Sequence, residues 1–327
     1  MAIDTHFSAR LRRWLVVLCA LAAVLGAAPS AGGAENGQVS MSPTSTAAGT
    51  QRPFFTYQLE RGGALTDSVT VTNTSDEALT LTLYATDAAV TTDGSFAPLN
   101  QDDPQAGLAT WVELSETEVT LTPDERVAVE FTVTTPETVE PGDYAAAIVA
   151  LQQGQGDVVE GEDVSLDVRS GVGARMYARV AGTLRPSIAV SSIELRPEQS
   201  LGSAFGLRGP ATLEFSITNT GNTRFVPIVS AELVGLFGIG RHEMAERTLP
   251  DLLPGGSVSV TEAFESVRPA AQLKATVIVR SPDGQTTADA STRSAFVPWG
   301  LVAIVLLIVL RFALPRVVRL VKQRNEA

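Results

Sequence analysis

Apolar and polar residues alternate with a period of two along most of the chain between Phe54 and Leu151. Valines and leucines take every second position from Val69, from Leu79 and from Val127, and threonines fill many of the positions between them. This alternation is typical of strands with one buried face, and the Asn, Pro, Gly and Asp residues between the runs mark turns. Helical periodicity is missing before the last apolar run. The pattern therefore predicts an all-β fold of the sandwich type.

A second set of alternating runs follows Leu184 and echoes the first. Residues 68–75 match residues 214–221 in register around a shared Asn-Thr turn, and residues 121–127 resemble residues 252–258. An Asn at such a turn has a structural explanation, because its side chain bonds the neighbouring backbone. We therefore predict a flexible N-terminus and two tandem immunoglobulin-like β-sandwich domains, at 35–50, 51–184 and 185–290.

Hydrophobic runs at the two ends of the chain have basic residues on opposite sides. Three arginines precede the run Trp14–Ala28, and five basic residues follow the run Ala295–Leu310. Because positive charge stays on the cytoplasmic side, the part between them is predicted to lie outside the cell, tethered to the cell membrane by a single pass. The predicted end segments are a signal peptide (1–34, with cleavage after Ala31 as the alternative), a juxtamembrane stalk (291–297), a transmembrane helix (298–315) and a basic cytoplasmic tail (316–327).

Charge and cysteine content narrow the function classes. The whole chain carries −12, the first 34 residues +2 and the tail from Arg311 +4, so the part between carries −18. Such an acidic surface argues against nucleic acid as a partner, because a nucleic-acid site needs a basic footprint. The only cysteine, Cys19, lies in the predicted signal peptide. The exported part must therefore fold without disulfides, and the sequence indicates no cofactor.

Few residues suited to catalysis occur in the exported part. His242 is its only histidine, so the two histidines of a zinc protease are missing. A Ser-His-Asp or Cys-His catalytic arrangement would have to use His242. Two carboxylates could still hydrolyse a glycosidic bond without histidine. The alternation, however, faces the candidates to solvent and points none of them into a cleft: Glu113, Glu116, Glu118 and Glu130. We therefore predict that the protein is not an enzyme, with a hydrolase of cell-wall polymers as the alternative.

Acidic clusters raise the question of calcium. One cluster is Asp102 and Asp103, and the other is formed by Glu160, Glu162 and Asp163. Calcium needs six or more oxygen ligands, and neither cluster shows a repeating ligand pattern. Solvated hairpin tips are the expected structure, and calcium binding stays open.

The first domain carries a longer excursion than the second, at residues 93–107, and long loops often hold function. Phe96 and Trp111 flank it, and flat aromatic rings stack on the C–H faces of sugars. A sandwich also buries such rings in its core, so a core position for Trp111 is the competing interpretation. The candidate glycan or partner contacts are Phe96, Trp111, Asp102 and Asp103.

Several of these elements occur in an order that resembles one family. They are Phe-Phe-Thr-Tyr-Gln (54–58), Val-Thr-Val-Thr-Asn-Thr (69–74), Trp-Val (111–112), Leu-Thr-Pro-Asp (121–124) and Pro-Gly-Asp-Tyr (141–144). Residues 54–183 resemble the peptidoglycan-binding domain of the WxL-interacting proteins of Gram-positive bacteria. The second half is similar to that family in position and architecture only. The resemblance implies peptidoglycan binding by the first domain and a WxL-type surface protein as the partner of the second.

These observations together predict a non-catalytic, membrane-anchored protein of the cell envelope. Its expected ligands are cell-wall peptidoglycan or another wall glycan, a surface protein, or both. An accessory subunit of an envelope membrane complex is a further alternative, in which the transmembrane helix and the basic tail pair with another membrane protein.

Overall fold

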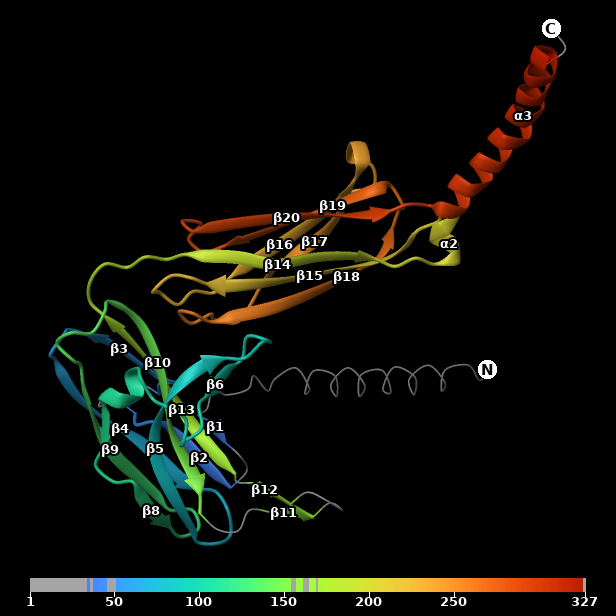
Figure 1. Cartoon of the computed structure of the whole chain (residues 1–327). Helices are drawn as coiled ribbons and strands as arrows, with labels where there is room; N and C mark the ends of the chain where they lie inside the picture. The colour runs from blue at the N-terminus through green and yellow to red at the C-terminus, as the bar shows by residue number, and fades with distance from the viewer. Residues whose placement is uncertain are drawn as a thin grey trace, which may run out of the picture.

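The structure is a computed structural model that describes residues 34–35, 38–45, 51–153, 157–160, 165–168 and 170–325. It contains two β-sandwiches in tandem, followed by one long apolar helix (Figure 1). The predicted all-β class with two immunoglobulin-like domains and a C-terminal helix is confirmed. The predicted signal peptide lies outside the described residues except for Ala34.

The first sandwich packs two sheets around one core. Its first sheet has the spatial order β1 (Ala34–Glu35), β2 (Val39–Pro43), β4 (Ala64–Asn73), β9 (Arg126–Thr134) and β7 (Val112–Leu114). Its second sheet has the order β3 (Phe55–Leu59), β13 (Gly171–Val180), β10 (Gly142–Gln152), β5 (Leu79–Val90) and β6 (Phe96–Pro98), with β8 (Glu118–Leu121) also paired to β5. A short 3₁₀ helix, η1 (Leu108–Trp111), precedes β7.

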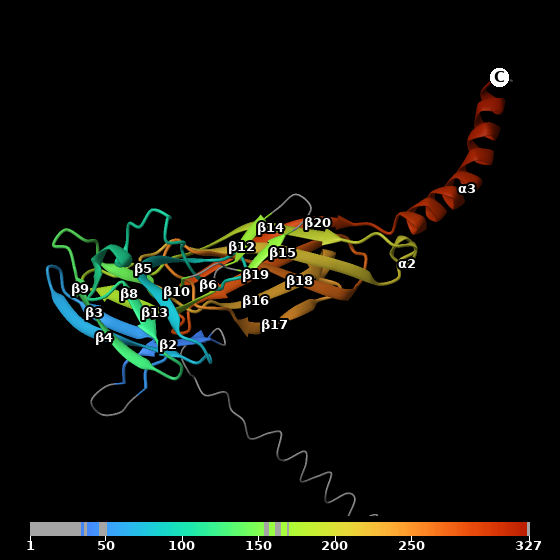
Figure 2. The same cartoon turned by 90° about the horizontal axis from the view of Figure 1, so that it is seen from below.

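The second sandwich is smaller and repeats the plan. One sheet has the order β14 (Ile188–Pro197), β15 (Gly209–Asn219) and β18 (Ser257–Val267). The other has the order β17 (His242–Thr248), β16 (Ile228–Gly235), β19 (Ala271–Arg280) and β20 (Thr287–Phe296). Short helical segments interrupt two of its connections, namely α2 (Leu201–Ala204) and η2 (Leu236–Gly238). In Figures 1 and 2 the final helix, α3 (Trp299–Asn325), leaves from the end of this sandwich that lies away from the first.

The internal repeat in the sequence corresponds to the same buried turn in both sandwiches. The side-chain amide of Asn73 donates to the carbonyls of Glu77 and Leu121 at 2.7 and 3.1 Å. Asn219 donates in the same way to Thr223 and Leu252, at 2.8 and 2.9 Å. Both asparagines are fully buried. The capping role predicted for the Asn-Thr turn is therefore confirmed. Each Asn also ties its turn to a segment distant in the sequence, namely the end of β8 at Leu121 in the first sandwich and the connection before β18 at Leu252 in the second.

The prediction of a flexible N-terminus over 35–50 is wrong for Val39–Pro43. These residues form β2, which pairs antiparallel with β4. The side chains of Val39 and Met41 are buried in the first core, so the short alternating run Val-Ser-Met-Ser has the same physical cause as the longer strands. Residues 46–50 lie outside the described residues.

The predicted stalk over 291–297 is also wrong. Strand β20 runs to Phe296, whose side chain is fully buried in the second core. Small polar and alanine residues alternate along this strand, and such an edge strand gives a weak hydrophobic signal. Only Val297 and Pro298 separate β20 from α3, which contains an 18-residue segment, Trp299–Arg316, long and apolar enough to cross a membrane.

A cluster of three side chains attaches the segment that precedes β3 to strand β4. Arg52 donates two hydrogen bonds to the carboxylate of Asp67, at 2.8 and 2.9 Å, and the Tyr57 hydroxyl donates a third at 2.7 Å. Burial by itself raises the pKa of Asp67, but these bonds and one from the backbone of Ser68 outweigh it and hold that pKa below its usual value.

This lowered pKa predicts a loss of stability in acid. A carboxyl with a depressed folded pKa stabilises the fold above its unfolded pKa, about 3.9, and that contribution is lost as the pH falls through the folded pKa. We expect Asp67→Asn to unfold more easily at neutral pH and to lose less stability than the parent between about pH 5 and pH 3. Urea unfolding at several pH values measures this, and parallel pH profiles would contradict it.

Candidate functional site

The first part of the long loop contacts the second sandwich. The backbone N–H of Ser259 donates to the carbonyl of Thr92 at 2.9 Å. Gly94 has φ +88°, and a Cβ there would lie 3.1 Å from Pro250 and 3.2 Å from Val258. This turn between β5 and β6 is therefore part of the contact between the domains, and only glycine fits it without strain.

Phe96 lies next to that contact and has neighbours on its ring. The ring meets Tyr177 edge to face, with centroids 5.9 Å apart, and the guanidinium of Arg175 lies 5.0 Å from its centroid. The side chain is half-buried. Phe96 thus stabilises the junction between β6 and β13, and its ring is not an open platform for a sugar.

Trp111 is a core residue, with 8% of its surface exposed. It ends η1, and its ring packs against Tyr144 at a centroid distance of 4.8 Å. A sugar cannot stack on this ring while the core is intact. The competing interpretation given above, a core position, is the one that the structure shows.

The two aspartates in the loop have different environments. Asp103 accepts hydrogen bonds from the backbone and the side chain of Asn100, at 2.8 and 3.1 Å, and so closes a local turn. Asp102 is exposed. Burial, and secondly the negative charge of Asp102, raise the pKa of Tyr84.

Tyr84 lies in a groove that we call the β5–β7 groove, at the side of the first sandwich where an edge of each sheet approaches the other. Its volume is about 520 Å³. Its lining is Thr82, Leu83, Tyr84, Ala85, Gln101, Ala109, Val112, Glu113, Leu114, Thr117 and Glu118. The groove therefore contains the predicted loop through Gln101, with Trp111 in the core behind it.

The loop wall of this groove is held firmly. The carboxylate of Asp87 accepts hydrogen bonds from the backbone N–H groups of Ala106, Gly107 and Ala109, at 2.7 to 2.8 Å. In return, the side-chain oxygen of Gln105 accepts from the backbone N–H of Asp87 at 2.6 Å. Because these bonds join the loop to a central strand, the groove is preformed.

The floor of the groove includes a stretch of strand edge without a neighbouring strand. On this side of β5, Leu83 donates to the carbonyl of Thr117, and Asp87 accepts from the backbone of Leu99. Alternation along the strand directs the N–H and C=O of Ala85, which lies between them, to the same side. Strand β8 pairs with β5 only up to Thr82 and β6 only from Ala88, so these groups face the groove.

Several side chains that line the groove have hydrogen-bond donors or acceptors without a partner in the described part of the chain. Within the described residues, the Tyr84 hydroxyl and the side chains of Gln101 and Glu113 make no hydrogen bond. Glu118 accepts one from Gln153 at 2.8 Å. Glu113 and Glu118 both line this groove, and both side chains are exposed to solvent, as the alternation predicted.

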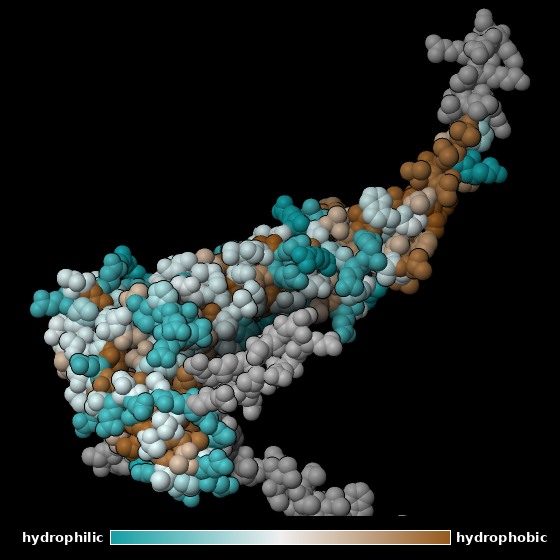
Figure 3. All heavy atoms as spheres, turned by 60° about the horizontal axis from the view of Figure 1, so that its bottom comes forward, coloured by the Kyte–Doolittle hydropathy of each residue, from teal (hydrophilic) through white to brown (hydrophobic). Residues whose placement is uncertain are grey.

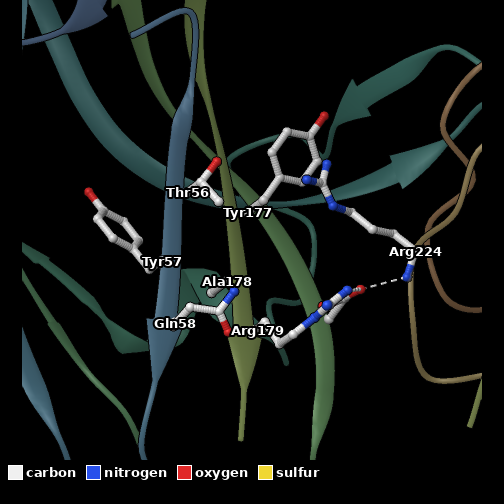
Figure 4. Close-up of a pocket in the computed structure, with 8 residues that line it drawn as sticks. Thr56, Tyr57, Gln58, Tyr177, Ala178, Arg179 and Arg224 are labelled. Carbon is white, nitrogen blue, oxygen red and sulfur yellow. Dashed lines mark hydrogen bonds and ion pairs between the residues drawn. The ribbon is translucent and has the colours of Figure 1, made fainter. Parts of the chain in front are cut away.

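A second, smaller pocket of about 120 Å³ lies where the domains meet. The guanidinium of Arg224, from the second sandwich, lies 4.1 Å above the ring of Tyr177 in the first (Figure 4). The buried carboxylate of Asp143 accepts two bonds from Arg179, at 2.6 and 2.7 Å, and one from the backbone N–H of Arg224 at 2.7 Å. These charges satisfy one another, so the pocket is a structural joint between the domains.

Neither groove nor joint has the donor set of a metal site. Among the described residues, no three His, Cys, Asp or Glu side chains converge. Glu160 belongs to the hairpin of β11 (Asp157–Glu160) and β12 (Ser165–Val168), whereas Glu162 and Asp163 lie outside the described residues. The solvated hairpin tip expected for that cluster, and the expectation of no cofactor, both stay predictions.

No protein-family model matches the chain, and no curated protein matches it. Among solved structures, a chaperone–tip adhesin complex of CFA/I fimbriae biogenesis is 12% identical, with 80% of this chain and 99% of that chain covered and a TM-score of 0.35. The class 5 fimbriae chaperone CfaA is 11% identical, with 78% and 98% covered and a TM-score of 0.34. A family 123 glycoside hydrolase from Clostridium perfringens is 10% identical, with 46% and 28% covered and a TM-score of 0.29. At these values, what those proteins bind or hydrolyse does not transfer to this chain.

Proposed function

We propose that the chain is a non-catalytic, membrane-anchored envelope protein whose first sandwich binds cell-wall glycan in the β5–β7 groove. The observation that carries the proposal is the preformed groove around Tyr84, which combines an aromatic ring with unpaired hydrogen-bonding groups. Its volume, about 520 Å³, falls within the range of roughly 300–1,000 Å³ typical of small-ligand sites.

The chemistry of the lining suits a sugar. A tyrosine ring offers an apolar face to the C–H groups of a pyranose, and its hydroxyl bonds at the edge. The amide of Gln101 and the carboxylate of Glu113 supply a donor and acceptors for hydroxyl groups or an N-acetyl group. The unpaired backbone of Ala85 adds one donor and one acceptor, which equally suits an amide of a wall peptide.

The position of the groove suits a wall ligand too. The groove belongs to the first sandwich, whereas α3 leaves from the far end of the second (Figure 1). A membrane-anchored chain built in this way presents the groove away from the bilayer, with the second sandwich as a spacer. The resemblance to WxL-interacting proteins, which implies peptidoglycan binding by this domain, agrees with the proposal.

Tyr84→Ala should weaken binding to purified wall sacculi about tenfold, because a lost aromatic contact costs about 1.4 kcal/mol. The measurement is co-sedimentation of the detergent-solubilised full-length protein over a range of sacculus concentrations. Glu113→Gln and Glu116→Gln form a matched pair, since both remove one exposed carboxylate and only the first lies in the groove. Equal binding by the Tyr84 variant and the parent would overturn the proposal.

A wall hydrolase is the competing function, because Glu113 and Glu118 both line the groove. A general acid that works near neutral pH needs a carboxyl group shielded from water, and both of these carboxylates are exposed. We therefore favour binding. Release of reducing ends from sacculi by the parent protein, abolished by Glu118→Gln, would show hydrolysis instead.

A protein partner is a second candidate, favoured by the free edge of β18 in the second sandwich. One side of β18 pairs with β15, and on the other Ser259 already donates to Thr92. The next outward-facing backbone groups, at Thr261 and Ala263, offer an extended segment the hydrogen bonds of an added strand. A WxL-type surface protein is the partner that the family resemblance implies. Crosslinking at Thr261 in the native envelope tests this binding mode.

A further inference from the structure

The end of the second sandwich next to α3 carries two unusually apolar loops. One is the connection from β14 to β15, with Leu201, Phe205 and Leu207 exposed by 85, 51 and 65%. The other is the connection from β16 to β17, and its apolar residues are Leu236, Phe237 and Ile239, exposed by 41, 90 and 55%. Outside α3, and among the residues whose side-chain exposure the structure describes, every large hydrophobic residue that is more than half exposed lies in one of these two loops.

Both loops lie at the point where the chain enters α3. A Cβ on Gly300, in the first turn of the helix, would lie 2.8 Å from the carbonyl of Ala204, so the first loop packs directly on α3. The second loop extends β16 at the end where β16 meets the start of β19, and Ala271 of β19 pairs with Phe296 of β20. In Figure 1 this loop projects from the same end of the sandwich, and in Figure 3 the apolar surface of α3 runs down to that end.

The backbone holds these side chains outward in closed turns. Gly235 donates to the carbonyl of Ile239 at 3.0 Å, and Phe237 has φ +60° at the tip between them. A left-handed conformation at a bulky residue costs about 1–2 kcal/mol, so an exposed phenylalanine at this position is unfavourable in water alone. In the other loop, Ser200 and Ser203 cap α2 reciprocally, and Leu207 donates back to Gly202.

We propose that these two loops enter the headgroup and upper acyl region of the bilayer leaflet that faces the second sandwich, the same bilayer that α3 crosses. The proposal rests on the membrane anchoring by α3. With only Val297 and Pro298 between β20 and the helix, the tether holds both loops at the lipid surface at a high effective concentration. Aromatic side chains are favoured at that depth, and Trp299 lies there as well.

Positively charged side chains lie beside both loops and suit the phosphate of lipid headgroups. Arg208 follows the first loop, and Arg268 lies beside the second, with its Cβ 3.8 Å from where a Cβ on Gly240 would be. Within the described residues, neither arginine forms a salt bridge with a carboxylate. Two guanidinium groups beside apolar loops offer phosphate contacts. The start of α3 and the two loops give the second sandwich three points of contact with the bilayer surface. The second sandwich therefore rests on the bilayer in one orientation and holds the first sandwich at a fixed height.

The test uses the full chain with Cys19→Ser, reconstituted in vesicles of phosphatidylglycerol and phosphatidylcholine, with one environment-sensitive fluorophore on a new cysteine. The test positions are Phe237→Cys and Leu207→Cys. Leu306→Cys, in the middle of the span, is the positive control, and Gln285→Cys, in the turn at the opposite end of the sandwich, is the negative control. Quenchers are carried at a shallow or a deep position of the lipid acyl chain.

The proposal expects a blue-shifted emission and strong quenching by the shallow quencher at Phe237 and Leu207, deep quenching at Leu306 and none at Gln285. Phe237 decides the outcome, because its loop belongs to a different pair of strands from the loop that packs on α3. An unquenched Phe237 beside a quenched Leu306 overturns the proposal and leaves the anchor intact. An unquenched Leu306 overturns the anchor and the proposal together. Glycan binding is judged separately, by sedimentation with sacculi.

Discussion

Replacing Asp143 with alanine is expected to uncouple the two sandwiches and to lower the free energy of unfolding by about 2 kcal/mol. Asp143 is buried at the joint and accepts three hydrogen bonds. Without it, the Arg179 guanidinium and the backbone N–H of Arg224 lose their acceptor. Breaking a fully buried ion pair costs about 3–5 kcal/mol, and we reduce that figure because the Arg179 side chain is 38% exposed.

Loss of coupling follows from where the lost bonds lie. Arg179 is in the first sandwich and Arg224 in the second, so one carboxylate bridges the domains. The neighbouring contacts are close as well, because a Cβ on Gly142 would lie 2.5 Å from the carbonyl of Asn222. The Asn222 amide donates in turn to the carbonyl of Pro141 at 2.8 Å. With Asp143 removed, these backbone contacts remain but no longer have a charge at their centre.

Urea unfolding followed by two signals measures the coupling. In a chain without the predicted signal peptide and with Trp299→Phe, Trp111 is the only tryptophan, so its fluorescence reports the first domain, whereas far-ultraviolet circular dichroism reports both. The unfolding transitions followed by the two signals should coincide in the parent protein and should occur at different urea concentrations in Asp143→Ala. Glu140→Gln is the matched control, since it removes an exposed carboxylate three residues away. Coincident transitions in the alanine variant would show that the joint does not depend on this residue.

Alternating side chains were enough to predict the fold class, because a two-residue period has one structural explanation over long runs. The same signal failed where the strand was short or built from small residues. Strand β2 buries only Val39, Met41 and Pro43, and β20 buries only Phe296, at its very end. Both errors moved a domain boundary, and the second concealed how close the sandwich lies to α3.

The candidate site was harder to predict, because its groove is formed by tertiary structure. Trp111 and Phe96 stood out as aromatic residues beside a long loop, but the first packs in the core and the second against Tyr177. Tyr84 has no local signal beyond its place on a strand. Its role depends on where β8 and β6 stop pairing with β5, which a period-two pattern does not reveal. Of the loop that the sequence singled out, Gln101 lines the groove, and the charge of Asp102 acts on Tyr84.

Asn73→Ala and Asn219→Ala should each lower the free energy of unfolding of their own sandwich by about 2–4 kcal/mol. Each side chain is fully buried and donates to two carbonyls that belong to different parts of its sandwich. Alanine leaves those carbonyls buried without a donor, at about 1–3 kcal/mol for each unsatisfied group. Urea unfolding measures both variants, with Trp111 fluorescence for the first domain and circular dichroism for the second.

Aspartate at the same positions separates hydrogen bonding from packing. It has nearly the volume of asparagine, but its carboxylate has no donor for the carbonyls of Leu121 or Leu252 and repels them. We therefore expect Asn73→Asp and Asn219→Asp to be at least as destabilising as the alanine variants. Thr74→Ala, an exposed neighbour, should change little. If aspartate restores the stability that alanine loses, volume and not the donated bonds maintains the repeated turn, and the two sandwiches share a shape without sharing this interaction.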